Sequence, residues 1–252
     1  MKKLKQIFQK EAFSPSWLLG IWINPFFIIR KGLFNGVKKT SKEIKGGKLI
    51  DIGCGSKPYE TLFDVEEYLG IDIRVSGHDH KSSKVDKYYD GKIIPFDDEF
   101  FDNAFSSEVF EHIFNIDEVL SEIHRVMKNN GKLCITCPFV WDEHEQPYDF
   151  ARYTSYGIRH ILNKNGFEVI QFYKSTSYLA TIFQMFSAYI FQHVLPKNKY
   201  IRFLLTPFFI APINILGSIL EIALPDADTF YHNNIVLAQK ISYKSPIQGA
   251  EP

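Results

Sequence analysis

The chain has 252 residues, of which 45% are hydrophobic, and its 29 basic residues balance 29 acidic ones. This size suffices for one α/β domain with a sizeable core and an appended segment. The zero net charge argues against a nucleic-acid partner, and three cysteines exclude a disulfide framework.

The first apolar run covers residues 17–29. It begins too late for a signal peptide, is broken by Asn24-Pro25 and lacks a small-residue cleavage site. It is also too short to span a bilayer. We therefore expect residues 1–45 to form an N-terminal helical lid or anchor. We also expect a cytoplasmic protein, either free or peripheral on the inner face of the membrane.

Short apolar strands alternate with helices from residue 47 onward. The expected strands are 47–52, 68–73, 85–89, 101–106, 132–138, 167–173 and 234–241. The expected helices are 57–65, a segment capped by Asp117 and ended by Gly131, and 154–163. This alternation is typical of an open, mostly parallel α/β sheet with helices on both faces.

Two glycines follow the first expected strand. Gly53 and Gly55 are separated by one residue, and Asp72 lies near the end of the second expected strand, seventeen residues after Gly55. Such glycines let the backbone approach a nucleoside-containing cofactor, and an acid at the end of the second strand accepts hydrogen bonds from ribose hydroxyls. A dinucleotide site has a third glycine where this chain has Pro58, so the pattern disfavours a nicotinamide cofactor.

Four segments in a fixed order carry a resemblance to a known family. They are 51–55 (Asp-Ile-Gly-Cys-Gly), 90–96 (Asp-Gly-Lys-Ile-Ile-Pro-Phe), 101–112 and 132–138. With the last strand, they resemble class I S-adenosyl-L-methionine (SAM)-dependent methyltransferases of the type 11-like family. The Gly-Cys-Gly-Ser-Lys-Pro-Tyr sequence at 53–59 is similar to a subgroup from bacterial cell-surface glycan and lipid biosynthesis clusters.

The resemblance implies a Rossmann-like class I methyltransferase fold. Its seven-stranded, mostly parallel sheet would have helices on both faces and a helical apolar insertion before the last strand. The core would comprise residues 46–175 and 230–242, and the cofactor would be SAM. The cofactor-binding residues that the resemblance implies are Asp51, Gly53, Cys54, Gly55, Asp72, Ile73, Asp90, Gly91, Ser107 and Glu108.

Several acidic residues also have a structural interpretation. Asp51 meets the cofactor ammonium in the family, but a carboxylate at this position can also cap the glycine turn. Asp72 is either a ribose ligand or a plain strand end, and Asp90 either contacts adenine or occupies a solvent-facing turn. Glu111 and His112 are expected to be structural, with His112 bonded to nearby backbone.

Two patterns that suggest metal ligands do not predict a metal site. His78-Asp79-His80 lies in a polar loop with no obvious third ligand. Cys134 and Cys137 lie in an apolar strand, where their odd separation directs them to opposite faces.

A second polar cluster follows the fifth expected strand, at the edge where ligands bind in such sheets. It lies in residues 138–153 and combines acidic, basic and aromatic side chains. His144 is the candidate general base, because an unperturbed imidazole titrates near neutral pH. Glu145 and Asp149 are candidates to orient it or to bind substrate. Arg152 either clamps a carboxylate or phosphate, or forms an ion pair with Asp149 that shapes the loop.

Residues 176–229 form an apolar insertion with helical character. Residues 203–220 carry no charge and reach the lower length limit for a spanning helix, but Pro207 and Pro212 interrupt them. Three roles stay open for the insertion. It forms a cap over an apolar substrate pocket, makes peripheral membrane contact that reaches a lipid-linked substrate, or forms a homodimer interface.

The leading hypothesis is a SAM-dependent methyltransferase that modifies a small-molecule, lipid-linked or sugar-linked substrate, at an oxygen atom. The alternatives are a catalytically silent methyltransferase-like scaffold or membrane adaptor and, less favoured, a NAD-dependent oxidoreductase. Methyl transfer from SAM needs no metal in principle, because the sulfonium methyl is already activated.

Overall fold

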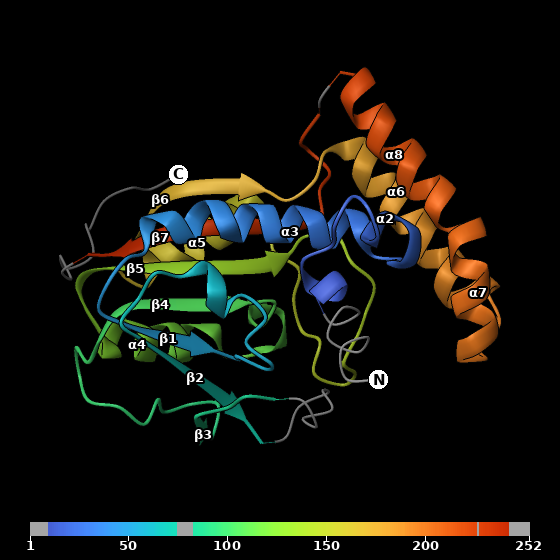
Figure 1. Ribbon diagram of the computed structural model, residues 1–252. Coiled ribbons are helices and arrows are strands. Elements are labelled where there is room, and N and C mark those ends of the chain that lie inside the picture. Colours follow the sequence, from blue (N-terminus) through green and yellow to red (C-terminus); the bar gives the residue numbers. More distant parts are fainter. Residues whose placement is uncertain (1–9, 75–82, 226, 242–252) are drawn as a thin grey trace. The chain divides into compact units, whose positions relative to one another are not determined.

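The computed structural model describes residues 10–74, 83–225 and 227–241 (Figure 1). The chain forms two compact units. Among the described residues, the sheet unit comprises 39–74, 83–138, 142–173 and 234–241, and the helical unit comprises 10–38, 139–141, 174–225 and 227–233. The N-terminal segment and the insertion therefore belong to one unit, whereas the sequence suggests separate segments.

The sheet has seven strands in the order β3-β2-β1-β4-β5-β7-β6. They are β1 (Lys48–Ile52), β2 (Glu67–Ile73), β3 (Lys87–Tyr89), β4 (Phe101–Ser107), β5 (Met127–Pro138), β6 (Phe167–Lys174) and β7 (Asn233–Lys240). Strands β1 to β5 pair in parallel. β7 is antiparallel to β6, because Ile241 bonds to Gly166 at one end and Asn233 to Ser175 at the other. This topology confirms the predicted Rossmann-like, mostly parallel sheet.

The strand order reverses between β1 and β4. The chain proceeds from β1 to β2 on one side and from β4 to β5 on the other, so the loops after β1 and β4 diverge here. In open α/β sheets, ligands bind outside the carboxyl ends of the strands at such a point. The glycines after β1 and the acids after β4 are thus placed at the edge where a cofactor site is expected.

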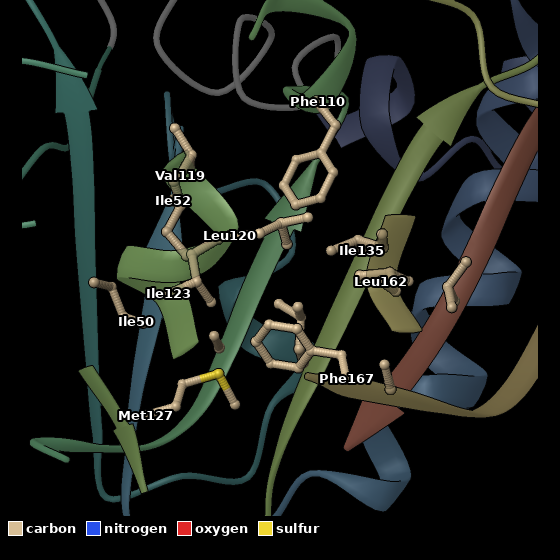
Figure 2. Packing of buried hydrophobic residues seen from close by; sticks show 14 of the residues in the cluster. Ile50, Ile52, Phe110, Val119, Leu120, Ile123, Met127, Ile135, Leu162 and Phe167 are labelled. Carbon is tan, nitrogen blue, oxygen red and sulfur yellow. The ribbon is translucent and has the colours of Figure 1, made fainter. Parts of the chain in front are cut away.

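One face of the sheet packs against α4 (Ile116–Val126) and α5 (Ser155–Lys164). In Figure 2, Leu120 and Ile123 of α4 lie beside Ile50 and Ile52 of β1. All four side chains are fully buried, and burial of each stabilises the fold by about 1.5–3 kcal/mol. The helical periodicity of the apolar residues in α4 explains this packing.

Aromatic side chains pack on the opposite face. The Phe105 ring of β4 lies 6.0 Å from the Tyr59 ring and 4.9 Å from the Phe63 ring, measured between centroids. The end of α3 (Phe27–Thr40) reaches this face, where the Thr40 hydroxyl lies 3.1 Å from the Cys134 sulfur. Helical residues therefore contact both faces, as predicted.

Three local predictions are wrong. The helix expected at 57–65 is a single 3-10 turn, η2 (Glu60–Leu62). Asp117 does not cap α4, because it lies inside the first turn and its carboxylate accepts a hydrogen bond from Lys164 Nζ at 2.6 Å. Gly131 does not end that helix, because β5 already begins at Met127 and contains Gly131.

The helical unit combines the N-terminal segment with the insertion. Its helices include α2 (Gly20–Ile23), most of α3, α6 (Tyr178–Tyr189), the π-helical turn η5 (Ile190–Val194), α7 (Lys199–Phe209) and α8 (Ala211–Ala223). Gln184 of α6 donates to the Pro25 carbonyl at 3.0 Å and accepts from the Ile29 N–H at 3.1 Å. Asn214 of α8 donates to the Ile21 carbonyl at 3.1 Å. Side-chain amides thus join the two segments.

Candidate functional site

The loop after β1 depends on its glycines. Gly53 and Gly55 have φ values of +70° and +47°, a region that residues with a side chain rarely adopt. A Cβ at Gly53 would lie 2.4 Å from Val109 Cγ2 in the loop after β4. A Cβ at Gly55 would meet nothing within 4 Å, so the backbone there is open to a ligand. The Gly53 N–H donates to the Ile71 carbonyl at 2.9 Å and fastens the loop to β2.

Asp72 lies near the end of β2, as predicted, and holds the glycine loop. Its Oδ2 accepts the Gly55 N–H at 3.1 Å, and its Oδ1 accepts the Ile73 N–H at 2.8 Å. The bond to Gly55 gives Asp72 a structural role that the sequence pattern does not reveal. Its contact with ribose stays a prediction.

Asp51 is buried directly before the loop, with 2% of its surface exposed. The Tyr68 hydroxyl donates to Asp51 Oδ2 at 2.7 Å. Burial raises the pKa of Asp51 to about 7, against the opposing effects of the Tyr68 hydrogen bond and the Lys57 charge. The N–H groups of the turn donate to Ile71 and Asp72 instead, so Asp51 does not cap the turn. Its carboxyl is a buried acid that a cationic group would help to ionise.

Lys57 lies beside the glycine loop but is not among the cofactor-binding residues that the family resemblance implies. Its side chain is buried beside the glycine loop and forms an ion pair with Asp86. Asp86 also accepts the Gly70 N–H at 2.6 Å. Although burial opposes the shift, the bonds from Lys57 and Gly70 hold the pKa of Asp86 below its usual range. The sequence signal is a lysine in the glycine loop and an acid directly before β3.

Cys54 lies between the two glycines and is also buried. Its thiol lies 3.9 Å from the Gly55 carbonyl, and a Cβ at Gly70 would lie 2.6 Å from its sulfur. Burial raises the pKa of this thiol. Cys54 therefore packs the loop against β2, and its contact with a cofactor stays a prediction.

Asp90 forms an exposed turn after β3. Its Oδ1 accepts the N–H groups of Lys92 at 2.8 Å and Ile93 at 2.9 Å, and these bonds lower its pKa. Gly91 follows with a φ of +81°. The solvent-facing turn is therefore present, and contacts of Asp90 and Gly91 with adenine stay predictions.

Ser107 and Glu108 lie where β4 ends beside β5. The Thr136 hydroxyl lies 2.8 Å from Ser107 Oγ and donates to Glu108 Oε1 at 2.7 Å. Glu108 has a φ of +55°, a left-handed conformation that turns the chain away from the strand direction. The turn leads into η4 (Phe110–His112) and brings Glu111 and His112 to the carboxyl edge.

An ion pair holds the loop after β5. The Arg152 guanidinium donates to both carboxylate oxygens of Asp149, at 2.6 and 2.7 Å. Arg152 also donates to the Asp142 carbonyl at 2.9 Å, and the His144 N–H donates to Asp149 Oδ2 at 2.9 Å. Although burial opposes the shift, the bonds from Arg152 and His144 hold the pKa of Asp149 at about 2. The internal ion pair is thus present, and substrate binding by Arg152 stays a prediction.

Glu111, His112 and His144 come together at the carboxyl edge. The two imidazole ring centroids are 4.9 Å apart. His112 Nε2 lies 3.9 Å from Glu111 Oε1 and 3.8 Å from Glu145 Oε2. Burial and the neighbouring Glu108 carboxylate hold the pKa of Glu111 well above its usual range, and burial lowers the pKa of His112. Glu111 and His112, for which the sequence predicts structural roles, therefore lie beside the candidate base His144.

Two further motifs have residue types that could bind a metal. His78-Asp79-His80 lies outside the described residues. Cys134 and Cys137 are buried free thiols that contact Thr40 and Asn234, respectively.

Comparison with known proteins agrees with this geometry. Residues 50–135 match the family described as methyltransferase domain. An uncharacterized protein of Methanocaldococcus jannaschii is 30% identical over 105 residues, which cover 40% of this chain and 41% of that protein. The chain thus spans less than half the length of this curated relative.

Several solved structures share the fold. The [4+2]-cyclase SpnF superposes with a TM-score of 0.54 at 18% identity, covering 84% of this chain and 82% of its own. Phosphoethanolamine N-methyltransferase 2 of Haemonchus contortus, solved with SAM, gives a TM-score of 0.54 at 21% identity, covering 94% of this chain and 57% of its own. YcgJ of Bacillus subtilis gives a TM-score of 0.51 at 14% identity, covering 83% of this chain and 99% of its own. The chain therefore has the Rossmann-like methyltransferase fold, and the match of residues 50–135 to a methyltransferase domain supports SAM as the cofactor.

Proposed function

We propose that this chain is a SAM-dependent methyltransferase that transfers a methyl group to an oxygen atom of a small, lipid-linked or sugar-linked metabolite. The supporting observation is that two features share one edge of the sheet. The glycine loop, fastened by Asp72, offers backbone groups and carboxylates to the cofactor. The cluster of Glu111, His112 and His144 offers acid–base groups to an acceptor.

The reaction requires alignment and removal of one proton. The sulfonium methyl is already activated, so the enzyme mainly aligns the acceptor oxygen with the S–CH3 bond. The O–CH3 bond forms as the S–CH3 bond breaks, and the electron pair stays on sulfur to give S-adenosylhomocysteine. We assign the acceptor proton to His144, whose Nδ1 lies 3.3 Å from Asp149 Oδ2. Glu145 and Arg152 are proposed to position the acceptor.

Asp72→Ala should remove most of the thermal stabilisation that SAM gives. A ligand that binds only the folded state stabilises it by about 2.7 kcal/mol at 100 times its Kd. The variant loses a ribose acceptor and the bond that holds Gly55. The measurement is a thermal-shift titration with SAM, S-adenosylhomocysteine and NADH. Glu66→Ala, which changes an exposed acid before β2, is the matched control and should behave as the wild type.

Two outcomes would contradict the proposed cofactor. The first is a folded wild-type protein that neither SAM nor S-adenosylhomocysteine stabilises. The second is stabilisation by NADH alone, which would favour the oxidoreductase. Stabilisation of Asp72→Ala equal to that of the wild type would instead remove Asp72 from the cofactor site.

Helices α6 and α8 of the helical unit have small or polar side chains inside and large apolar ones outside. Large apolar residues of a soluble bundle face inward. In α6 and α8 the buried positions are small or polar: Ala180, Thr181, Gln184, Ser187, Ala188, Ala211, Asn214, Gly217 and Ser218. The exposed positions of these helices include Tyr178, Ile182, Phe186, Tyr189, Leu216, Ile219 and Ile222. Small and polar residues at helix contacts, with apolar residues outside, are typical of helices packed in lipid.

Helix α7 extends this apolar surface. Phe203, Leu204 and Phe208 are 49%, 66% and 76% exposed. Among the described residues, one helical segment, Lys199–Ala223, is long and apolar enough to cross a membrane, by length and composition alone. Pro207 lies inside α7, which ends at Phe209 before α8 begins at Ala211, and this interruption favours a bent segment over a straight span.

We further propose that the helical unit binds an anionic membrane surface peripherally through residues 176–229 and that the acceptor is lipid-linked. The supporting observation is that the charged residues of this segment before Glu221 are basic. Lys197 precedes α7, Lys199 and Arg202 lie in its first turn, and no acidic residue occurs between Glu168 and Glu221. Basic residues beside an exposed apolar surface suit the interface of anionic lipids. A homodimer interface and a substrate cap are the competing roles.

Replacing Phe203, Leu204 and Phe208 together with serine should abolish binding to vesicles that contain anionic lipid, because their apolar area drives insertion. The measurement is flotation of the full chain with phosphatidylglycerol-containing vesicles. Replacing Ile93, Phe114 and Tyr156 with serine is the matched control, because these three are similarly exposed in the sheet unit. A wild type that dimerises through this surface and does not float would contradict the membrane role.

A further inference from the structure

The cluster at the carboxyl edge has the composition of a metal site. One carboxylate oxygen of Glu111 and one ring nitrogen each of His112 and His144 lie within 4.8 Å of one another. Glu145 Oε2 lies 3.8 Å from His112 Nε2 and could supply a further oxygen. Two imidazoles and a carboxylate form a ligand set that transition metals commonly use.

Glu111 supplies an independent observation. Its side chain is fully buried, and neither carboxylate oxygen has a hydrogen-bond partner. Burying such a group unpaired costs free energy, whereas a bound cation would offset that cost. Glu111 Oε1 lies 3.9 Å from His112 Nε2, so the unpartnered carboxylate points into the cluster.

The backbone orients the imidazole rings as ligands. His112 Nδ1 lies 2.8 Å from the Tyr148 carbonyl, so Nδ1–H donates there and the Nε2 lone pair faces Glu111 and Glu145. His144 Nδ1 lies 3.3 Å from two acceptors, the Asp142 carbonyl and Asp149 Oδ2, and 3.5 Å from one donor, the Arg152 guanidinium. The two shorter contacts favour a proton on Nδ1, which leaves Nε2 as the acceptor atom. Histidine ligands of metals characteristically donate their other ring N–H to a carbonyl or carboxylate.

We propose that Glu111, His112 and His144 bind one divalent transition-metal ion, such as Zn²⁺ or Mn²⁺. Nitrogen ligands favour such ions over Mg²⁺ and Ca²⁺, which prefer oxygen. Ligands about 2.1 Å from one ion are roughly 3 to 3.5 Å apart. The 3.9 Å between Glu111 Oε1 and His112 Nε2 must therefore shorten by less than one ångström on binding, and the other ligand pairs, which lie within 4.8 Å, by at most about 1.8 Å.

The ion gives the proposed methyltransferase a defined acceptor chemistry. A hydroxyl oxygen of the acceptor would bind at an open position of the metal, which lowers the pKa of that hydroxyl. His144 would then act as a ligand instead of the base, and the proton of that hydroxyl would pass to solvent water. This role rests on the proposed function, whereas metal binding itself does not.

The test is metal binding by the purified full chain after treatment with a chelator. Zn²⁺, Mn²⁺ and Mg²⁺ are each titrated by calorimetry, and Co²⁺ is added for its visible absorption spectrum. Glu111→Gln and His112→Asn remove proposed ligands. Glu143→Gln and His160→Asn are matched controls, because both residues are exposed. Stabilisation by SAM is measured on the same samples.

We expect one Zn²⁺ or Mn²⁺ per wild-type chain, a Co²⁺ spectrum typical of nitrogen ligands, and little response to Mg²⁺. Affinity should fall at least tenfold in Glu111→Gln and His112→Asn and stay unchanged in the controls. Absence of stoichiometric binding, or equal binding by the two ligand variants, would overturn the metal site. If SAM still stabilises those samples, the proposed methyltransferase stands without a metal.

Discussion

Asp51→Asn should stabilise the ligand-free protein at neutral pH and weaken its binding of SAM. Asp51 is fully buried, and loss of hydration raises its pKa from 3.8 to about 7. Ionisation of this carboxyl therefore opposes folding by roughly 4 kcal/mol above pH 7. Asparagine keeps the size of the side chain and avoids that cost, but it cannot balance the charge of a cofactor ammonium.

The sign of the pH dependence follows from the raised pKa. The folded protein holds the Asp51 proton more tightly than the unfolded chain, so this contribution is complete below pH 4 and is lost as pH rises through 7. Denaturant unfolding measures this effect. The difference in free energy of unfolding between Asp51→Asn and the wild type should be smallest near pH 4 and increase towards pH 8. Wild-type affinity for SAM should fall about tenfold from pH 8 to pH 6, because only about a tenth of Asp51 is ionised at pH 6.

Tyr68→Phe is the comparison for Asp51→Asn. It removes the hydroxyl that donates to Asp51 Oδ2, so the ionised carboxyl loses a partner. This variant should lose stability, and most strongly above pH 7. If Asp51→Asn also lost stability at pH 8, the buried carboxylate would be a stabilising group, and the argument from its hydration would fail.

Asp149→Asn should destabilise the protein by about 3 kcal/mol, because it leaves Arg152 without its counter-ion. The Asp149 side chain is 3% exposed and accepts two bonds from Arg152, at 2.6 and 2.7 Å. The Arg152 side chain is 23% exposed, so water can partly solvate its charge in the variant. We therefore expect a loss of stability at the low end of the range for buried ion pairs. With its pKa held at about 2, Asp149 contributes stability that is present above about pH 4 and is lost as pH falls towards 2.

A double-mutant cycle separates this structural role from substrate binding. Asp149→Asn, Arg152→Met and the double variant should show a coupling free energy of at least about 1 kcal/mol. Glu143→Gln, an exposed acid of the same loop, should change stability by less than about 0.5 kcal/mol. If Asp149→Asn left stability unchanged while KM for the acceptor rose, the pair would serve substrate binding and not the shape of the loop.

The sheet could be predicted from the sequence because local signals define its strands. Apolar runs and turn residues place the first, second, fourth, sixth and seventh strands within one residue at each end. The α5 helix was also predictable, because Thr154 is an N-cap whose side chain accepts the Gly157 N–H at 3.0 Å. These signals act within one element and need no knowledge of the tertiary structure.

The features that the sequence could not reveal depend on interactions between residues far apart in the chain. β5 starts at Met127, where pairing with Phe101 across a register shift overrides the helical pattern. Lys57 and Asp86 lie 29 positions apart, and no local pattern joins them. Glu111 becomes an unpartnered buried acid only because the loop after β5 covers η4, with the Phe150 N–H donating to the Glu111 carbonyl at 2.8 Å.

The position of β7 determines when the sheet can be completed during translation. β7 lies between β5 and β6, yet it follows α6, α7 and α8 in the chain. Until residues 233–240 leave the ribosome, β5 and β6 each present an unpaired edge, and the sheet is open. The apolar helices emerge first. Under the proposed membrane role, a nascent chain would reach the lipid surface before its catalytic sheet is complete, so targeting would precede activity.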